Sequence, residues 1–239
     1  MKKDVKRFKE SVFYPIGFVV FLWVIKIYES LFSVDFTEYG ILPEKVSGLK
    51  GIITGPLVHG DFNHLFSNTI PLLISAIGIL YFYRKIAVKA ILVIYIATGL
   101  GVWIAARDAY YHIGISGVVY GLVAFLFFSG VFRKDTRAIA VSLIVIFLLG
   151  GMIYGVFPTD PKISWESHLI GALSGLLAAF YFRKVDVFES IESSEFFDES
   201  IITSVTELPD DVAKGNEPIS FIYDFKPSNK YLDGKDYQN

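Results

Sequence analysis

Six apolar stretches separated by charged residues constrain what this chain of 239 residues can fold into. A helix needs about 20 predominantly apolar residues to cross the hydrocarbon core of a bilayer, with a range of about 17–25. None of the stretches alternates with period two, as the strands of a membrane barrel do. The sequence therefore predicts an all-α membrane protein, a bundle of six transmembrane helices at residues 11–25 (continuing to 28), 65–83, 90–106, 113–132, 138–159 and 167–182.

The composition agrees with a membrane protein and excludes several classes of chemistry. Charged residues make up 19% of the chain and hydrophobic residues 53%, whereas an ordinary soluble protein is about 25% charged. A soluble domain of this length needs more charge to cover its surface. The chain has no cysteine, which excludes disulfide frameworks, thiol catalysis and metal sites with cysteine ligands.

The lysines and arginines predict how the helices are oriented. Thirteen of them would lie on one side of the bilayer, against five on the other side. Because cytoplasmic segments carry the excess of these residues, both termini are expected in the cytoplasm. No small-residue cleavage site follows the basic N-terminus, so we expect an uncleaved first helix rather than a signal peptide.

The two ends of the chain differ in charge. Residues 1–184 carry 18 Lys and Arg against 11 Asp and Glu, whereas residues 185–239 carry 4 against 13. We therefore predict a basic six-helix membrane domain over residues 1–184 and an acidic, flexible cytoplasmic tail over residues 185–239. A compact chain without cysteine or an organelle-targeting presequence indicates the plasma membrane of a bacterium.

Several polar residues fall within or beside the apolar stretches, where they are costly and usually functional. In the predicted topology the four histidines lie at or near the outer ends of the helices: His59, His64, His112 and His168. Ser116, Asn68 and two of these histidines, from three helices, lie at one depth on one side of the bilayer. The first outer connection, residues 29–63, is too rich in glycine and proline to be one regular helix.

Ser116 lies in the sequence Gly114-Ile-Ser-Gly117 at the start of the fourth stretch. A serine hydroxyl becomes a good nucleophile only when a base takes its proton. Flanking glycines allow a tight backbone and the close approach of a substrate, and a helix N-terminus suits a developing oxyanion. The alternative is that these small residues serve only in helix packing.

His168 is a candidate base, because imidazole titrates near neutrality. Gly171 and Gly175 follow it on the same helical face. Two glycines on this face let another helix approach closely, which would bring a serine of the fourth helix within reach of the imidazole. The alternative is an interfacial histidine that precedes a packing motif.

His64 and Asn68 are four residues apart, so they project from one face of the second predicted helix. Both can donate hydrogen bonds to an oxygen that becomes negative in a transition state. The alternatives are that Asn68 joins two helices by a hydrogen bond, or that His64 and its neighbours hold a metal ion. We expect His59 to tie the outer connection to the helix end, and His112 to be an exposed loop residue.

The combined pattern resembles the rhomboid family of intramembrane serine proteases. Three motifs carry the resemblance, in order on the second, fourth and sixth predicted helices: His59-x4-His64-x3-Asn68, Gly114-x-Ser116-Gly117 with Tyr120 four residues after the serine, and His168-x2-Gly171-x3-Gly175. The likeness spans roughly residues 10–184 and implies the basic six-helix form of that family. The chain lacks the Trp-Arg pair that many members carry in the first outer loop.

The resemblance implies a Ser–His dyad without a buried acid. Ser116 would attack the scissile carbonyl, and His168 would act as the general base with Tyr120 packed against its ring. His64, Asn68 and the backbone N–H of Ser116 would form the oxyanion hole. Four glycines would support this geometry: Gly114, Gly117, Gly171 and Gly175. The substrates would be other membrane proteins, cut within or near a transmembrane helix.

Two other classes of function stay open. A rhomboid-like protein without proteolytic activity would bind or route membrane proteins, although such relatives usually lack the serine or the histidine. A transporter or metal-dependent membrane enzyme would use the histidine cluster, but no charged residue falls at the middle of a predicted helix, where ion relays usually have one. The protease hypothesis needs no cofactor and no metal. Its partners would be transmembrane substrates and the lipid bilayer, not nucleic acid.

Overall fold

The computed structural model describes residues 2–107, 110–158 and 164–187. The chain divides into two units, Met1–Ser190 and Ile191–Asn239, and all the described residues belong to the first. The regular structure of this part of the chain is helical, apart from an isolated antiparallel β-bridge between Ile41 and His112. The acidic tail lies outside the described residues from 188 onward, so its flexibility and the domain boundary at 184 stay predictions.

Five of the described helical segments are long and apolar enough to cross a membrane. They are α1 (Lys2–Phe32), α3 (Phe62–Phe82), α4 (Ala87–Ala105), α5 (Ser116–Arg133), and the run of α6 (Thr136–Leu149) with the 3₁₀ helix η4 (Gly150–Val156). Helix α7 (Trp165–Tyr181) covers the sixth predicted stretch with 17 residues. The prediction of a helical membrane bundle is therefore confirmed.

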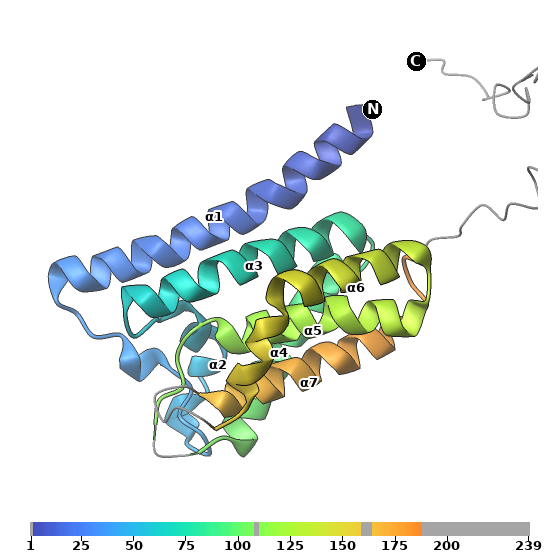
Figure 1. The fold of residues 1–239 in the computed structure, drawn as a ribbon. Coiled ribbons are helices and arrows are strands. Elements are labelled where there is room, and N and C mark those ends of the chain that lie inside the picture. Colours follow the sequence, from blue (N-terminus) through green and yellow to red (C-terminus); the bar gives the residue numbers. More distant parts are fainter. Residues whose placement is uncertain (1, 108–109, 159–163, 188–239) are drawn as a thin grey trace, which may run out of the picture. The chain divides into compact units, whose positions relative to one another are not determined.

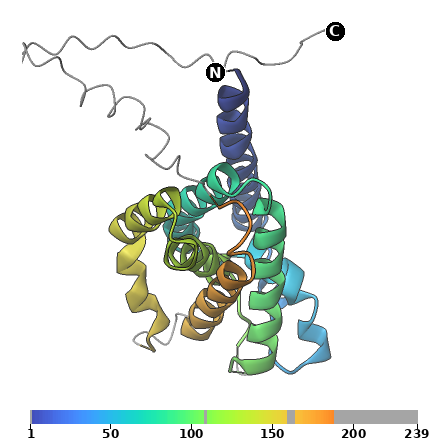
Figure 2. The ribbon, with the colours of Figure 1, turned by 90° about the vertical axis from the view of Figure 1, so that its right-hand side faces the viewer.

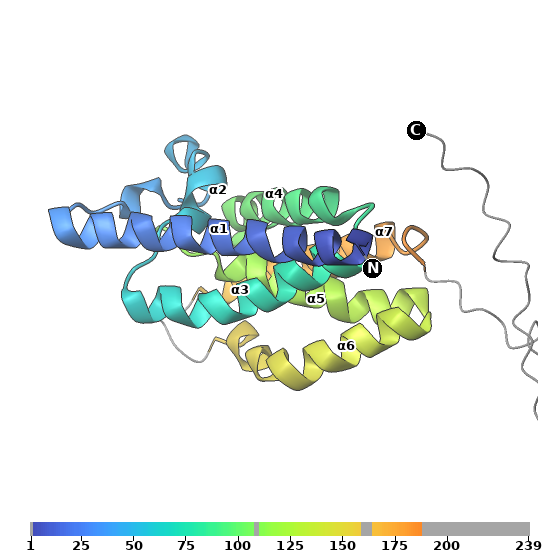
Figure 3. The same cartoon turned by 90° about the horizontal axis from the view of Figure 1, so that it is seen from above.

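Helix α5 lies at the centre of this bundle. It packs against α7, α6, α3 and α4, and Figure 2 shows it nearly end-on among these neighbours. Helices α4 and α6 lie on opposite sides of the bundle (Figure 3), and α1 runs along α3 (Figure 1). Burying α5 on several faces fits its many small residues, which let other helices come close. The core beside it contains large buried side chains, among them Leu22, Ile79, Tyr83, Leu122 and Phe125.

The outer connection before α3 folds into short helical turns instead of one helix, as its glycines and prolines predict. These turns are η1 (Thr37–Tyr39), η2 (Val46–Gly48), α2 (Gly51–Thr54) and η3 (Gly55–Leu57). A Cβ on Gly51 would overlap the backbone of Gly40, so the connection packs against itself. It ends at Asp61, the N-cap of α3, whose carboxylate accepts a 2.7 Å hydrogen bond from the His64 N–H.

The fifth predicted stretch differs from the expected continuous helix over residues 138–159. Its α-helix ends at Leu149, and a 3₁₀ helix continues from Gly150 to Val156. Two consecutive glycines, Gly150 and Gly151, weaken the α-helix at this point. The tighter 3₁₀ turn changes where its carbonyl groups point. Two of these carbonyls, those of Met152 and Gly155, accept hydrogen bonds from side chains of α5 and α7.

Candidate active site

Ser116 and His168 meet at one end of the bundle. Ser116 is the first residue of α5, and His168 lies in the first turn of α7. The Ser116 Oγ and the His168 Nε2 are 2.9 Å apart, and both residues are 8% exposed. This is the separation of a hydrogen bond between a nucleophile and its base.

The other nitrogen of His168 fixes the tautomer of the ring. Its Nδ1 lies 2.8 Å from the carbonyl oxygen of Gly155, and a carbonyl can only accept a hydrogen bond. In the neutral ring, Nδ1 therefore carries the proton, and Nε2 is free to accept from the Ser116 hydroxyl. Tyr120 stacks on the imidazole with ring centroids 4.1 Å apart and planes 9° apart, while its hydroxyl donates to the Met152 carbonyl at 2.7 Å.

Glycines bring α5 and α7 close enough for this pairing. A Cβ on Gly171 would overlap the carbonyl oxygen of Gly117, and a Cβ on Gly175 would overlap that of Gly121. The two helices therefore touch backbone to backbone just below the Ser–His pair. Any larger residue at these α7 positions would force the helices apart.

The turn that precedes Ser116 also requires glycine. Gly114 has a φ of +100°, and a Cβ there would lie 2.6 Å from the Cε1 of His64. Its N–H donates to the Gly55 carbonyl at 3.0 Å, which ties the turn to the outer connection. Glycine meets both requirements, because it tolerates positive φ and has no side chain to strike the imidazole.

A cavity of about 920 Å³ lies beside the Ser–His pair. Ser116, His168, His64, Asn68 and Tyr120 all line it, so the structure brings together the proposed dyad and the proposed oxyanion donors. Asn68 is 7% exposed, and its Nδ2 is a buried donor without a hydrogen-bond partner among the described residues. A buried amide donor without a partner is costly. An acceptor on a ligand in the cavity would remove this cost by accepting a hydrogen bond from it.

His59 supports the cavity from outside it. The residue is 1% exposed, and its Nε2 lies 3.4 Å from the backbone N–H of Ile115, next to Ser116. Its ring also packs edge-on against that of His64, with centroids 5.2 Å apart. Burial, together with the nearby His64, lowers the pKa of His59 from 6.5 to about 4. The ring is therefore neutral at pH 7 and can accept the Ile115 hydrogen bond.

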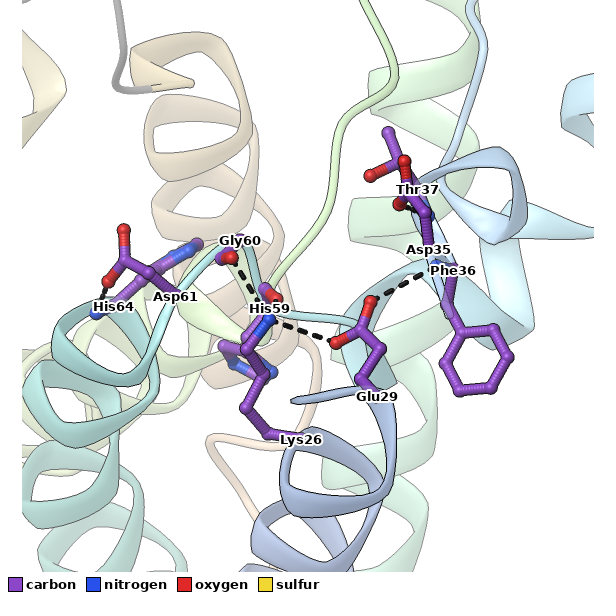
Figure 4. Close-up of polar contacts among 9 residues, drawn as sticks. All are labelled: Lys26, Glu29, Asp35, Phe36, Thr37, His59, Gly60, Asp61 and His64. Carbon is purple, nitrogen blue, oxygen red and sulfur yellow. Dashed lines mark hydrogen bonds and ion pairs between the residues drawn. The ribbon is translucent and has the colours of Figure 1, made fainter. Parts of the chain in front are cut away.

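A lysine of α1 holds the segment between His59 and α3, as Figure 4 shows. The Lys26 Nζ donates to the carbonyls of His59 (2.9 Å) and Gly60 (3.0 Å) and pairs with the Glu29 carboxylate at 3.0 Å. The other Glu29 oxygen accepts from the Phe36 N–H at 3.1 Å. The helix extends to Phe32, and the amine bonds within the protein.

The expectation that His112 is an exposed loop residue is wrong. It is 6% exposed, and its backbone forms the β-bridge with Ile41. Its two ring nitrogens lie 2.6 Å from the Ser164 Oγ and 3.0 Å from the Arg107 carbonyl oxygen. The bridge buries this residue, which hydropathy alone could not indicate.

Several contributors to the site carry no signal in the sequence. The Gly155 and Met152 carbonyls are backbone groups, and their positions depend on the 3₁₀ turn of η4. Arg107 forms two hydrogen bonds with Glu166, two residues before His168. Among the described residues, no group of three or more His, Cys, Asp or Glu is arranged to hold a metal ion.

The fold and this site define a polytopic helical membrane protein with a Ser–His pair at one end of its bundle. The Rhomboid domain model matches residues 47–185. The chain is 35% identical over 173 residues to an uncharacterised protein of Mycobacterium bovis, which covers 68% of this chain and 71% of that protein, and the same holds for one of Mycobacterium tuberculosis. A Bacillus subtilis protein, named as a candidate rhomboid protease, is 27% identical over 133 residues, 54% of this chain and 65% of that protein. No solved structure gives a significant match.

The chain belongs to the rhomboid family. Rhomboid proteins are generally intramembrane serine proteases that act on membrane proteins within the bilayer. The family and the apolar helices together indicate a multi-pass membrane protein with bacterial relatives.

Proposed function

We propose that this protein is an intramembrane serine endopeptidase that hydrolyses peptide bonds in or near transmembrane segments of other membrane proteins. The observation that carries the proposal is the 2.9 Å hydrogen bond between Ser116 and His168 beside a large cavity. A nucleophile paired with a base, next to space for a substrate, is the arrangement that acyl transfer requires.

In the proposed reaction, the Ser116 Oγ attacks the scissile carbonyl carbon while the His168 Nε2 takes the hydroxyl proton. The resulting oxyanion is stabilised by the Asn68 amide, the His64 ring and the Ser116 backbone N–H. The imidazolium then gives its proton to the leaving amine, and an acyl-enzyme remains on Ser116. A water molecule, deprotonated by the same imidazole, hydrolyses the ester and restores the serine.

The histidine is oriented without a carboxylate. The Gly155 carbonyl accepts from Nδ1–H at 2.8 Å, and the stacked Tyr120 ring fixes the imidazole plane. A carbonyl fixes the tautomer as a carboxylate does, but it carries no full charge to stabilise the imidazolium. We therefore propose that the oxyanion donors supply a larger share of the rate enhancement here than they do in an enzyme with a serine–histidine–aspartate triad.

The membrane setting explains which substrates suit this site. A helix in lipid keeps every backbone carbonyl in a hydrogen bond, so a transmembrane segment must unwind before a serine can reach it. The substrates are therefore membrane proteins whose helices contain small or helix-breaking residues near the cut. We also propose that α7 is the sixth transmembrane helix, that both termini are cytoplasmic, and that the protein lies in a bacterial plasma membrane with residues 185–239 as a cytoplasmic tail.

Labelling of the detergent-solubilised protein with a fluorophosphonate tests the proposal. These reagents phosphonylate activated serines, so the native chain is expected to be labelled, and Ser116→Ala and His168→Ala are not. A native chain that stays unlabelled, while cleavage of membrane proteins persists in Ser116→Ala, would show that the serine is not the nucleophile. A native chain that neither labels nor cleaves would indicate the alternative, a rhomboid-like binding or quality-control protein without proteolytic activity.

A further inference from the structure

A second hydrogen bond joins the two segments that carry the Ser–His pair. The His112 Nδ1 and the Ser164 Oγ are 2.6 Å apart. His112 lies four residues before Ser116, and Ser164 lies four residues before His168. Both pairs are therefore separated by 52 residues along the chain. The two contacts are successive links between the entrance to α5 and the entrance to α7.

The direction of this second link can be assigned from its partners. The His112 Nε2 lies 3.0 Å from the Arg107 carbonyl, which can only accept, so Nε2 carries the proton of the neutral ring. Burial lowers the pKa of His112, which favours this neutral form. Nδ1 then accepts from the Ser164 hydroxyl, and the Ser164 Oγ accepts in turn from Ser167 at 2.6 Å.

Each end of the link is anchored to the backbone that positions the dyad. The His112 N–H and carbonyl exchange hydrogen bonds of 2.8 and 2.9 Å with Ile41 of the outer connection. The Ser164 carbonyl accepts from the backbone N–H of His168 at 3.3 Å, in the first turn of α7. The Ser164 hydroxyl therefore connects a fixed histidine with the turn that holds the catalytic imidazole.

We propose that His112 and Ser164 are positioning residues that set the distance between Ser116 and His168. This inference rests on the proposed function, because it assumes that the Ser–His distance governs a reaction. On the cytoplasmic side of the dyad, the glycine contacts between α5 and α7 fix the helix separation. On its outer side the His112–Ser164 link does so, together with the ion pair of Arg107 and Glu166.

Ser164→Ala removes the link and leaves both dyad side chains chemically intact. We expect the second-order rate of fluorophosphonate labelling, and kcat for a transmembrane substrate, to fall about 10- to 100-fold, because small displacements of reacting groups cost that much. KM should change little, since Ser164 contributes a single hydroxyl to the wall of the cavity and the rest of the lining is kept. Ser174→Ala is the matched control, because within the described part of the chain this buried serine of α7 bonds only to the Ile170 carbonyl of its own helix, and it should label at the native rate.

Two substitutions of His112 separate positioning from folding. The amide of asparagine overlies Nδ1 and can keep the bond to Ser164, whereas that of glutamine overlies Nε2 and keeps only the bond to Arg107. We expect His112→Asn to label much faster than His112→Gln, whatever their order in thermal stability. Equal rates in these two variants, or a native rate in Ser164→Ala, would overturn the inference.

The same assay separates this inference from the proposed function. Ser116→Ala must abolish labelling if the serine is the nucleophile, whatever His112 does. If Ser116→Ala is not labelled while Ser164→Ala is labelled at the native rate, the positioning role of His112 and Ser164 is refuted and the proposed function is not. Labelling that survives in Ser116→Ala would refute the proposed function, and the inference with it.

Discussion

At the scale of single residues, His59 is a histidine whose ionisation the fold suppresses strongly. Its folded pKa of about 4 lies below the ordinary 6.5, because burial disfavours the charged ring. The unfolded chain therefore binds a proton below pH 6.5, while the folded chain does so only near pH 4. Stability from this residue is fully present above pH 6.5 and is lost as the pH falls toward 4, with about 2 kcal/mol lost by pH 5.

Thermal unfolding in detergent at pH 7 and pH 5 measures this effect. His59→Gln keeps an acceptor for the Ile115 N–H but cannot be protonated, so its midpoint should fall less between the two pH values than that of the native chain. His112 has a lowered pKa as well, but it contributes equally to both proteins. The same fall in both proteins would contradict the assignment.

The role of Asn68 is a second prediction at the scale of single residues, because it depends on one unpaired side-chain amide. Its buried Nδ2 lacks a partner among the described residues, so Asn68→Ala removes no hydrogen bond from the resting protein. We expect thermal stability to stay near the native value while kcat falls about 10²- to 10³-fold, the usual cost of losing one oxyanion donor. Unfolding midpoints and single-turnover rates decide this, and a loss of stability in parallel with activity would argue for a structural role.

At the scale of helices, the contact between α5 and α7 is the most sensitive to side-chain size. Gly171→Ala places a Cβ on the Gly117 carbonyl, so the helices must separate and the Ser116–His168 distance must grow. We expect a loss of labelling together with a lower unfolding midpoint. Gly17→Ala is the control, because a Cβ at this α1 position has no atom within 4 Å, and alanine favours a helix by about 1 kcal/mol over glycine. Equal effects of the two substitutions would contradict the packing argument.

Helix α1 contributes to the site through Lys26 and Glu29. Lys26→Met leaves Glu29 as a buried carboxylate without its ion pair, and leaves the carbonyls of His59 and Gly60 without their donor. Breaking a buried pair in this way costs about 3–5 kcal/mol. Lys6→Met breaks the exposed Lys6–Glu10 pair on the same helix, which should cost less than about 1 kcal/mol. Thermal unfolding compares the two variants, and similar midpoints would show that the Lys26 network is dispensable.

How much the sequence predicts also depends on scale. The helix positions follow from the apolar stretches, because a bilayer leaves a chain few other ways to satisfy its backbone. The motif residues can be recognised in the sequence because polar groups at membrane depth are costly and usually functional. They are Ser116, His168, His64 and Asn68. The burial of His112 and the bonds of Lys26 could not be predicted, since both depend on how the outer connection folds back on the helix ends.

At the scale of the whole molecule, the rhomboid fold places a large cavity and a Ser–His pair in one helical bundle. Helices α3, α5 and α7 each bring one part of the proposed machinery to the cavity. They respectively carry the oxyanion donors, the nucleophile and the base. Helix α1 and the outer connection hold these parts from outside. Activity should therefore depend on the intact bundle rather than on any one helix.

Cleavage of a single-span membrane protein in reconstituted liposomes tests the central claim most directly. The account predicts that the native chain cuts a substrate whose transmembrane helix contains glycines, that Ser116→Ala and His168→Ala do not, and that chelators have no effect. Both variants should unfold at nearly the native temperature, since each retains the glycine contacts of α5 and α7. Continued cleavage by a correctly folded Ser116→Ala protein would contradict the account.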